Sequence, residues 1–514
     1  MEPQTQSIQK AWGDQGDGTF GNPVIWADFN NPWLMQVGSD FYLTAASHHF
    51  MGMPVLHSRD LVNWQLVGRV YERLDHDPVY DHPGQAYQRG SWAPALVHHA
   101  GQFWMYCMNS TDGLFLSTAP GAAGPWTPVE LIHKAFHWED PYPFWDEDGQ
   151  AYLIHSGFGG KAPLVVHRMR PDGRKLLDDG FVLPETYPNA HNPLLLKRDG
   201  YYYLFGTTAG TQKVFRSRSI YGPYEQRVLL LSKGVSSSPG GAGWVELPDE
   251  CWFMHHVGMP GHGRLPYLQP AGWKDGWPWM GANVNPEGAG EIAWRWPKPH
   301  TGINGPAALP AGSDDFDSPA LGWQWRWNHN PRPASWSLAE RPGWLRLKAG
   351  LLETAAGEDG VHLPIPYQPD SLVFAANTLV QLPVGRCCQG TTRLDVSGMA
   401  AGQRAGLSLF NQDYLWIGAV QDENNLRRVR VCTNSTRVDG PELRQDGLWL
   451  RAFAEDGAGR VAYSLDGVDF MPLGVPIPLQ IQWFEAHKFA LFSYNVQSQA
   501  GQADFAGFWL DILE

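Results

Sequence analysis

The chain has 514 residues, a net charge of −14 and 43% hydrophobic residues. A single hydrophobic core rarely grows beyond about 250–300 residues, so this length predicts two domains. The acidic charge and the lack of basic runs exclude a nucleic-acid binder, which needs clustered lysine and arginine to displace counterions. No stretch of 18 apolar residues is present, so no membrane-spanning helix is expected.

The cysteines and the first residues bear on the compartment. The count of 5 cysteines is odd, Cys387 and Cys388 are adjacent, and no Cys-x-x-Cys pattern exists. We therefore expect free thiols in a reducing compartment. The start, Met1-Glu2-Pro3-Gln4, has neither a basic nor an apolar leader segment. A cytoplasmic protein is expected, unless the sequence lacks its signal.

A turn followed by an aromatic strand recurs along the first 300 residues, where helical periodicity is almost absent. Four copies begin with glycine and a fifth does not; they are residues 38–43, 101–105, 149–153, 200–204 and 250–254. The period of roughly 50–60 residues is the scale of one four-stranded propeller blade. The pattern predicts a five-bladed β-propeller, with an irregular β-sandwich as the alternative.

A change in the sequence pattern marks the start of the second domain. Residues 296–312 are rich in proline and glycine, and the strands after them alternate without a blade period. We predict a propeller over residues 1–300, a linker over 301–313 and a β-sandwich of the jelly-roll, concanavalin-like kind over 314–514.

Propellers usually act at their central channel, where the innermost strand of each blade delivers its first residues. The candidates at those points are Asp28, Asn31, Trp33, Trp92, Asp140 and His191, with His255, His256 and Arg264 in the fifth blade. Glu139 precedes Asp140. Because neighbours on a strand point to opposite faces, we expect Glu139 to lie outside the site.

These blocks resemble glycoside hydrolase family 43, nearest its xylosidase/arabinofuranosidase branch with a C-terminal sandwich. The resemblance rests on residues 22–25, 89–94, 140–141, 197–203, 252–255, 268–270, 323–331 and 340–343, and covers nearly the whole chain. It implies an exo-acting glycosidase that removes a terminal pentose, or a small furanose or pyranose sugar, from plant- or algal-type oligosaccharides. It also implies inversion of the anomeric centre.

An inverting glycosidase uses a base and an acid that stand roughly 6.5–9.5 Å apart, and in this family a third carboxylate adjusts the acid. By resemblance, the third carboxylate is Asp140, but Asn31 stands where the base belongs and His191 where the acid Glu belongs. An amide cannot take a proton from water. Three explanations stay open: an engineered or natural loss of Asp at position 31, another base with Asp28 nearest, or sugar binding without cleavage.

His191 can still serve as the acid, since an imidazolium donates protons and a neighbouring Asp140 raises its pKa. The alternative is a channel histidine that binds a ligand hydroxyl, with Glu185 as the fallback acid. Arg264 is expected either to contact sugar hydroxyls or to form a salt bridge within the fifth blade, and His255 is expected to bind the substrate. Trp33 and Trp92 either line the sugar subsite or fill the space between blades.

The resemblance implies no required cofactor. Asp315 and Asp504 resemble the pair that holds a structural Ca²⁺ in such sandwich domains, where a hard cation collects several oxygens. The expected partner is an oligosaccharide, with no nucleic acid and no membrane, and nothing in the sequence excludes an oligomer. A catalytically inactive, carbohydrate-binding propeller is the alternative function.

Overall fold

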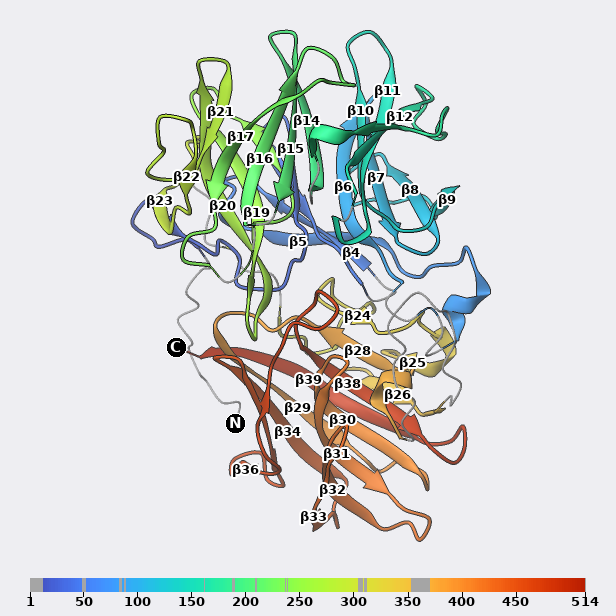
Figure 1. Cartoon of the computed structure of the whole chain (residues 1–514). Coiled ribbons are helices and arrows are strands. Elements are labelled where there is room, and N and C mark those ends of the chain that lie inside the picture. The colour runs from blue at the N-terminus through green and yellow to red at the C-terminus, as the bar shows by residue number, and fades with distance from the viewer. Residues whose placement is uncertain are drawn as a thin grey trace.

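The structure, a computed structural model, describes residues 13–48, 52–82, 86, 89–160, 162–186, 190–208, 210–235, 237, 239–303, 308, 312–352 and 370–513. A β-propeller forms the upper lobe of Figure 1 and a β-sandwich the lower lobe. The helices of the described residues are short 3-10 turns: η1 (Pro78–Asp81), η2 (Phe158–Gly160), η3 (Pro184–Thr186), η4 (Pro333–Ser335) and η5 (Leu372–Phe374). None of them could cross a membrane. The predicted all-β fold is confirmed.

Each propeller blade is an antiparallel sheet whose strands follow one another in sequence. Blade 1 contains β2 (Trp33–Val37), β3 (Asp40–Thr44), β4 (Gly52–Ser58) and β5 (Gln65–Tyr71). Blade 2 contains β6 (Trp92–His99), β7 (Gln102–Asn109), β8 (Gly113–Ala119) and β9 (Glu130–Lys134). Blade 3 contains β10 (Trp138–Trp145), β11 (Ala151–Gly157), β12 (Leu164–Met169) and β13 (Phe181–Leu183). Blades 4 and 5, described next, complete the five predicted blades.

Blade 4 contains β14 (His191–Arg198), β15 (Tyr201–Thr208), β16 (Thr211–Ser217) and β17 (Glu225–Leu231), with β22 (Gly290–Glu291) added in parallel to β17. Blade 5 contains β18 (Trp244–Glu246), β19 (Cys251–Met259), β20 (Gly263–Lys274) and β21 (Trp277–Met280). Beside the blades, β1 (Thr19–Gly21) pairs with β23 (Arg295–Pro297). The repeated aromatic motif of the sequence marks the second strand of every blade, because these strands bury their large side chains between neighbouring blades.

The innermost strand of each blade starts with the same irregular backbone. One residue there has a positive φ: Asn31 (46°), Ala93 (36°), Asp140 (54°), Asn192 (49°) and Gly241 (80°). In blades 2, 3 and 4 the strand pairing shifts register at this point. Such a bulge interrupts the alternation of side chains, so two consecutive residues can face the same side of the sheet. The propeller axis is lined from these positions.

The sandwich consists of two predominantly antiparallel sheets. The first contains β24 (Arg326–Trp327), β28 (Thr378–Gln381), β38 (Lys488–Asn495), β30 (Gln403–Phe410), β31 (Tyr414–Gln421), β32 (Arg427–Thr433) and β33 (Arg437–Glu442), with β27 (Gly350–Leu351) on β38. The second contains β25 (Trp336–Ser337), β26 (Leu345–Lys348), β39 (Gln502–Leu513), β29 (Cys387–Asp395), β34 (Gly447–Glu455), β35 (Ala458–Ser464) and β36 (Met471–Pro472), with β37 (Ile477–Pro478) on β35. Leu407 and Phe489 of the first sheet meet Leu345 and Phe505 of the second in one core.

Polar contacts join the two lobes. The β19–β20 hairpin reaches the sandwich, where the His262 ring lies 2.9 Å from the Arg386 carbonyl oxygen. Farther along the interface, Asn330 exchanges two hydrogen bonds with the backbone of Leu74, at 2.8 and 3.0 Å.

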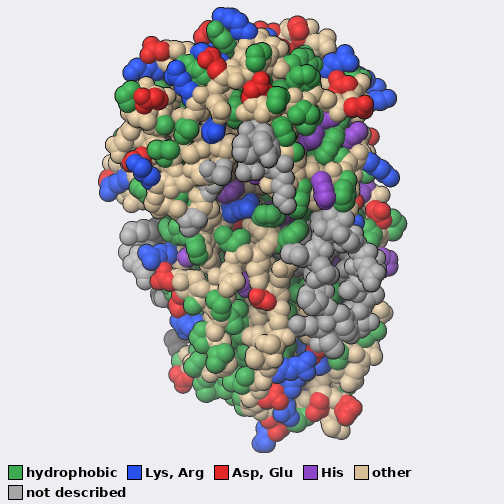
Figure 2. All heavy atoms as spheres, in the orientation of Figure 1, with side chains coloured by type: hydrophobic (Ala, Val, Ile, Leu, Met, Phe, Trp, Pro, Cys, Tyr) green, Lys and Arg blue, Asp and Glu red, His purple; other side chains and the backbone are tan. Residues whose placement is uncertain are grey.

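Acidic and basic side chains are interspersed over the face shown in Figure 2. All five cysteines are free thiols, as predicted.

Candidate active site

A cavity of about 710 Å³ opens at the start of the innermost strands. Of the predicted site residues, it is lined by Asn31, Trp92, Asp140, His191 and Arg264. These residues come from five different blades, so the propeller brings together positions that lie far apart in the chain.

Asp140 and His191 form a pair on one side of the cavity. The Nδ1 atom of His191 lies 3.8 Å from Oδ2 of Asp140. Oδ2 also accepts hydrogen bonds from the Ser156 hydroxyl at 2.7 Å and the Asn192 N–H at 2.9 Å, and Oδ1 accepts one from the Asn192 amide at 3.1 Å. Burial acts to raise the pKa of Asp140, but His191 and these donors lower it overall.

The same pair raises the pKa of His191. Burial acts to lower it, but the hydrogen bond and the negative charge of the neighbouring Asp140 carboxylate raise it overall. The His191 side chain keeps 29% of its surface exposed, so the imidazole is accessible from the cavity. This is the arrangement expected for an imidazolium that can donate a proton.

Glu139 lies in the cavity, so the expectation that it points away from the site is wrong. The reason is the bulge in β10: pairing with β11 shifts after Glu139, and Asp140 takes a positive φ. Glu139 Oε2 accepts a hydrogen bond from the Gly159 N–H at 3.0 Å. Burial and the negative charge of Asp140 raise the pKa of Glu139 to about 8.

A sequence signal for Glu139 existed. Asp140 and Asn192 each have a positive φ and each precede a proline, Pro141 and Pro193. Glu139 therefore stands in blade 3 where His191 stands in blade 4. The repeat shared by the blades, rather than strand alternation, was the guide to its direction.

On blade 1, Asn31 lines the cavity but Asp28 does not. Asp28 is buried, and its carboxylate accepts hydrogen bonds from the backbone N–H groups of Arg264 at 2.7 Å and Ala486 at 2.6 Å. Burial, together with the charge of Glu485, raises the pKa of Asp28 to about 6. Asp28 thus joins blade 5 to the sandwich, and the structure places it away from the position needed to activate a water.

Blade 5 presents Arg264 and His256 to the cavity, while His255 does not reach it. His255 is fully buried: Nδ1 contacts the His256 carbonyl at 3.1 Å, and Nε2 contacts the Gln269 amide at 3.1 Å. His256 follows it on the opposite face of β19 and packs on Gly240, where a Cβ atom would lie only 2.5 Å from the imidazole. Burial lowers the pKa of His256, so the ring is neutral.

The sandwich supplies one wall of the cavity. Phe484 lines it, and the Arg264 guanidinium lies 4.6 Å from the centre of the Phe484 ring. The Phe484 carbonyl accepts a hydrogen bond from Asn30 at 2.9 Å, and the next residue, Glu485, accepts one from the His48 N–H at 2.7 Å. Trp92 lies beside the ring, with 6.2 Å between centroids. Nothing in the sequence distinguished Phe484.

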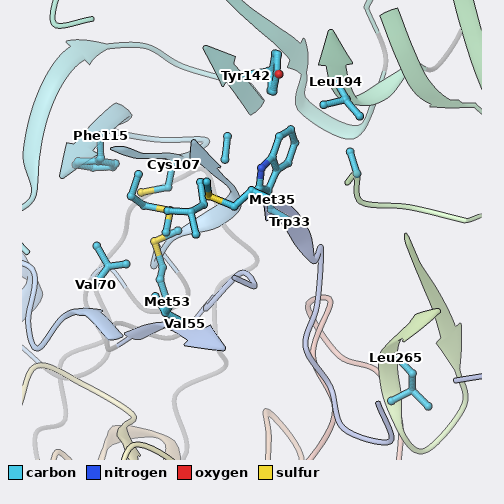
Figure 3. Close-up of a cluster of buried hydrophobic side chains, with 14 of the residues drawn as sticks. Trp33, Met35, Met53, Val55, Val70, Cys107, Phe115, Tyr142, Leu194 and Leu265 are labelled. Atoms are coloured by element: carbon cyan, nitrogen blue, oxygen red, sulfur yellow. The ribbon is translucent and has the colours of Figure 1, made fainter. Parts of the chain in front are cut away.

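Two further candidates lie elsewhere. Trp33 is buried in the core between blades, with its ring 5.1 Å from that of Tyr142 (Figure 3). Of its two predicted roles, the structure shows the packing between blades. Glu185 belongs to η3 and lies near Gly222, outside the residues that line the cavity.

Asp315 and Asp504 are not brought together. Both oxygens of Asp504 accept hydrogen bonds from Arg346, at 2.8 and 2.9 Å, and Arg341 adds another at 2.9 Å. Asp315 accepts from the indole of Trp509, which lies five residues along β39 from Asp504, about 16 Å away. The arrangement offers no common position for a cation.

Glu139, Asp140 and His191 are the one group of potential metal ligands found among the described residues, with one atom of each within 4.8 Å of the others. A hard cation needs six or more oxygens. Here both Asp140 oxygens already accept hydrogen bonds, and the pKa of His191 is raised, which disfavours the neutral imidazole that a metal ion requires. These three residues are therefore better suited to sharing protons among themselves than to binding a metal ion.

Comparison with known proteins agrees with this geometry. The profile "Glycosyl hydrolases family 43" matches residues 20–278, and "Beta xylosidase C-terminal Concanavalin A-like domain" matches residues 313–511. A putative beta-xylosidase of Xylanibacter ruminicola is 40% identical over 90% of this chain and 84% of its own length. A beta-xylosidase of Formosa agariphila is 33% identical over 98% of this chain and 92% of its own length.

Among solved structures, the bifunctional GH43-CE protein of Bacteroides eggerthii superposes with a TM-score of 0.81 at 31% identity. The match covers 96% of this chain but 64% of that protein, which is therefore longer. Family profiles, relatives and fold all lead to one assignment. The chain belongs to glycoside hydrolase family 43 and is a glycosidase with a β-propeller and a concanavalin-like β-sandwich.

Proposed function

We propose that this glycosidase removes a terminal pentose, xylose in the first instance, from oligosaccharides of plant or algal type by an exo-acting, inverting route. The observation that carries the proposal is the cavity at the propeller axis, which Asp140, His191 and Asn31 line together and to which the sandwich adds Phe484 as a wall. A pocket bounded on one side by a second domain suits the end of a chain. The names of the two beta-xylosidases support a pentose.

The two sides of the cavity take different parts in the proposed reaction. On the blade 3–blade 4 side, which holds the family's acid position at His191, the leaving glycosidic oxygen receives its proton. On the blade 1 side, water attacks the anomeric carbon. Asn31 can orient this water through its amide but cannot accept its proton, so the proton passes to solvent and turnover is slow.

Arg264 and Trp92 are proposed to hold the sugar. Both line the cavity, and Arg264 is fixed from two directions by the Asn30 amide oxygen at 3.1 Å and by the Phe484 ring. A guanidinium has five donors for sugar hydroxyls, and an indole offers an apolar surface to a sugar ring. Neither contact requires a metal or a cofactor.

The test is turnover of aryl xylosides, aryl arabinofuranosides and oligosaccharides by the chain itself and by Asn31→Asp. The proposal expects slow release of a single sugar by the chain and much faster release by the variant. Xylose affinity, measured by calorimetry, is the control for an intact pocket. Binding without turnover in both proteins would instead support an inactive carbohydrate-binding propeller.

A further inference from the structure

We propose that Glu139 is a further catalytic residue, the acid whose proton passes to the leaving glycosidic oxygen, with His191 as the positive charge beside it. The inference rests on the proposed function, because it assigns the proton to one residue of that site. It gives Glu139 a role for which the family's three carboxylate positions have no counterpart.

The first observation is position. Glu139 and His191 each stand one residue before the residue of positive φ in adjacent blades, and both line the cavity. The bulge in β10 turns Glu139 inward together with Asp140. Two neighbouring blades thus deliver side chains from equivalent positions to one side of the same pocket.

The second observation is which carboxyl is available. Both oxygens of Asp140 already accept hydrogen bonds, and Asp140 is only 7% exposed. Glu139 is half-buried, and the hydrogen bond that it accepts from the Gly159 N–H occupies Oε2. Among the carboxyl groups that line the cavity in the described residues, Glu139 is therefore the one with an oxygen left for a ligand.

The third observation excludes the opposite role. One atom of Glu139 lies within 4.8 Å of one atom of His191. An inverting acid and base stand about 6.5–9.5 Å apart, because the sugar and the attacking water lie between them. Glu139 is too close to His191 to face it across a sugar. It lies on the leaving-group side, where a proton is needed.

The surrounding charges suit a proton donor. Asp140 and burial keep the Glu139 carboxyl protonated at neutral pH, while His191 and Arg264 would stabilise the carboxylate that remains after transfer. His155, on the neighbouring strand β11, interacts with Asp140 and is neutral, since burial lowers its pKa to about 3. Loss of the proton from His191 would instead leave Asp140 without its positive partner.

The step balances as follows. The O–H bond of Glu139 breaks and its proton bonds to the glycosidic oxygen as the bond from that oxygen to the anomeric carbon breaks. Water adds to the anomeric carbon from the Asn31 side and releases its extra proton to solvent. Glu139 then regains a proton from solvent, so the products are the free sugar and the shortened oligosaccharide.

The experiment compares Glu139→Gln, His191→Gln and the control Glu147→Gln, which alters an exposed carboxylate of the same blade. Each is assayed on a phenyl and a dinitrophenyl xyloside. A dinitrophenolate leaves without protonation, so Glu139→Gln is expected to lose about 10²–10⁴-fold on the phenyl substrate and little on the other. Glu147→Gln should match the parent on both.

The pH profile assigns the proton to one residue. In the parent, activity should fall as pH rises through the titration of Glu139. This limb should vanish in Glu139→Gln and move to higher pH in His191→Gln, because removing a positive neighbour raises the pKa of an acid. A limb that vanishes in His191→Gln and persists in Glu139→Gln would make His191 the donor and overturn the inference.

Two other results would also overturn it. An equal loss on both substrates in Glu139→Gln would indicate a structural or binding role. An infrared difference titration, parent minus Glu139→Gln, reads protonation without turnover, and an ionised Glu139 at neutral pH would contradict a donor. If neither the parent nor Asn31→Asp turns over any substrate, the proposed function itself fails. Normal turnover by Glu139→Gln is a different result: it leaves the proposed function intact and contradicts only the role of Glu139.

Discussion

Blades 3 and 4 deliver Glu139, Asp140 and His191 to one side of the cavity, whereas blade 1 delivers Asn31 to the other. The backbone that presents them is the same, a residue of positive φ at the start of an innermost strand. One side can store and donate protons, and the other can only form hydrogen bonds. The propeller thus fixes where side chains meet, while single residues decide which half of a hydrolysis the site can perform.

The largest expected effect comes from giving the blade 1 side of the cavity a carboxylate, as the blade 3–blade 4 side already has. Asn31→Asp should raise kcat by about 10²–10⁴-fold, because a carboxylate can accept the proton of the attacking water. The measurement is steady-state kinetics on a phenyl xyloside, with xylose affinity as the control. An unchanged kcat would mean that position 31 does not contact the attacking water.

The second prediction concerns the negative charge of Asp140, which lies beside the proton-donating residues. Asp140→Asn should lower kcat by about 10²–10³-fold, because His191 loses the carboxylate that raises its pKa and favours the positive charge beside the leaving group. The check is an NMR titration of His191 alongside the kinetics. The pKa of His191 should fall in the variant, and a pKa that stays in place would refute the pairing.

The joint between blade 1 and the sandwich gives a pH-dependent prediction. The folded-state pKa of Asp28, about 6, lies above its ordinary value of 3.8. Protonated Asp28 therefore favours the folded state below about pH 4, and this stability is lost as pH rises through 6. The loss amounts to about 3 kcal/mol. Urea unfolding at several pH values should show this slope in the parent.

Asp28→Asn is the comparison for that slope. An amide does not titrate, so the free energy of unfolding of the variant should lack the Asp28 contribution between about pH 4 and 6. Its absolute stability will also fall, since one of the two backbone N–H groups loses its acceptor. The difference in slope is the readout, and identical slopes would contradict the raised pKa.

The smallest effect is expected from the sandwich wall. Phe484→Ala should raise KM by about tenfold with little change in kcat, since the ring covers Arg264 and contributes apolar surface without touching the proton-donating cluster. A matched control is Phe181→Ala, an exposed phenylalanine in β13 away from the cavity. A large drop in kcat would show that the wall also orients the reacting bond.

Part of the site was readable from sequence because it repeats. The spacing of the aromatic strands predicted five blades, and the positions before the innermost strands predicted Asn31, Trp92, Asp140 and His191. Glu139 was misjudged because strict alternation was assumed where the strand carries a bulge. His255 was chosen over His256 because a sequence alone does not show which face of β19 meets the cavity.

What the sequence determined by itself was the periodic part of the protein: the blade repeat, the change of texture between the domains and the residue types at each blade start. These follow from local turn and strand preferences that recur along the chain. The tertiary structure decided the rest. It diverted Asp28 to the sandwich, turned Glu139 inward and brought Phe484 to the cavity. Such outcomes depend on contacts between residues hundreds of positions apart, which no local pattern encodes.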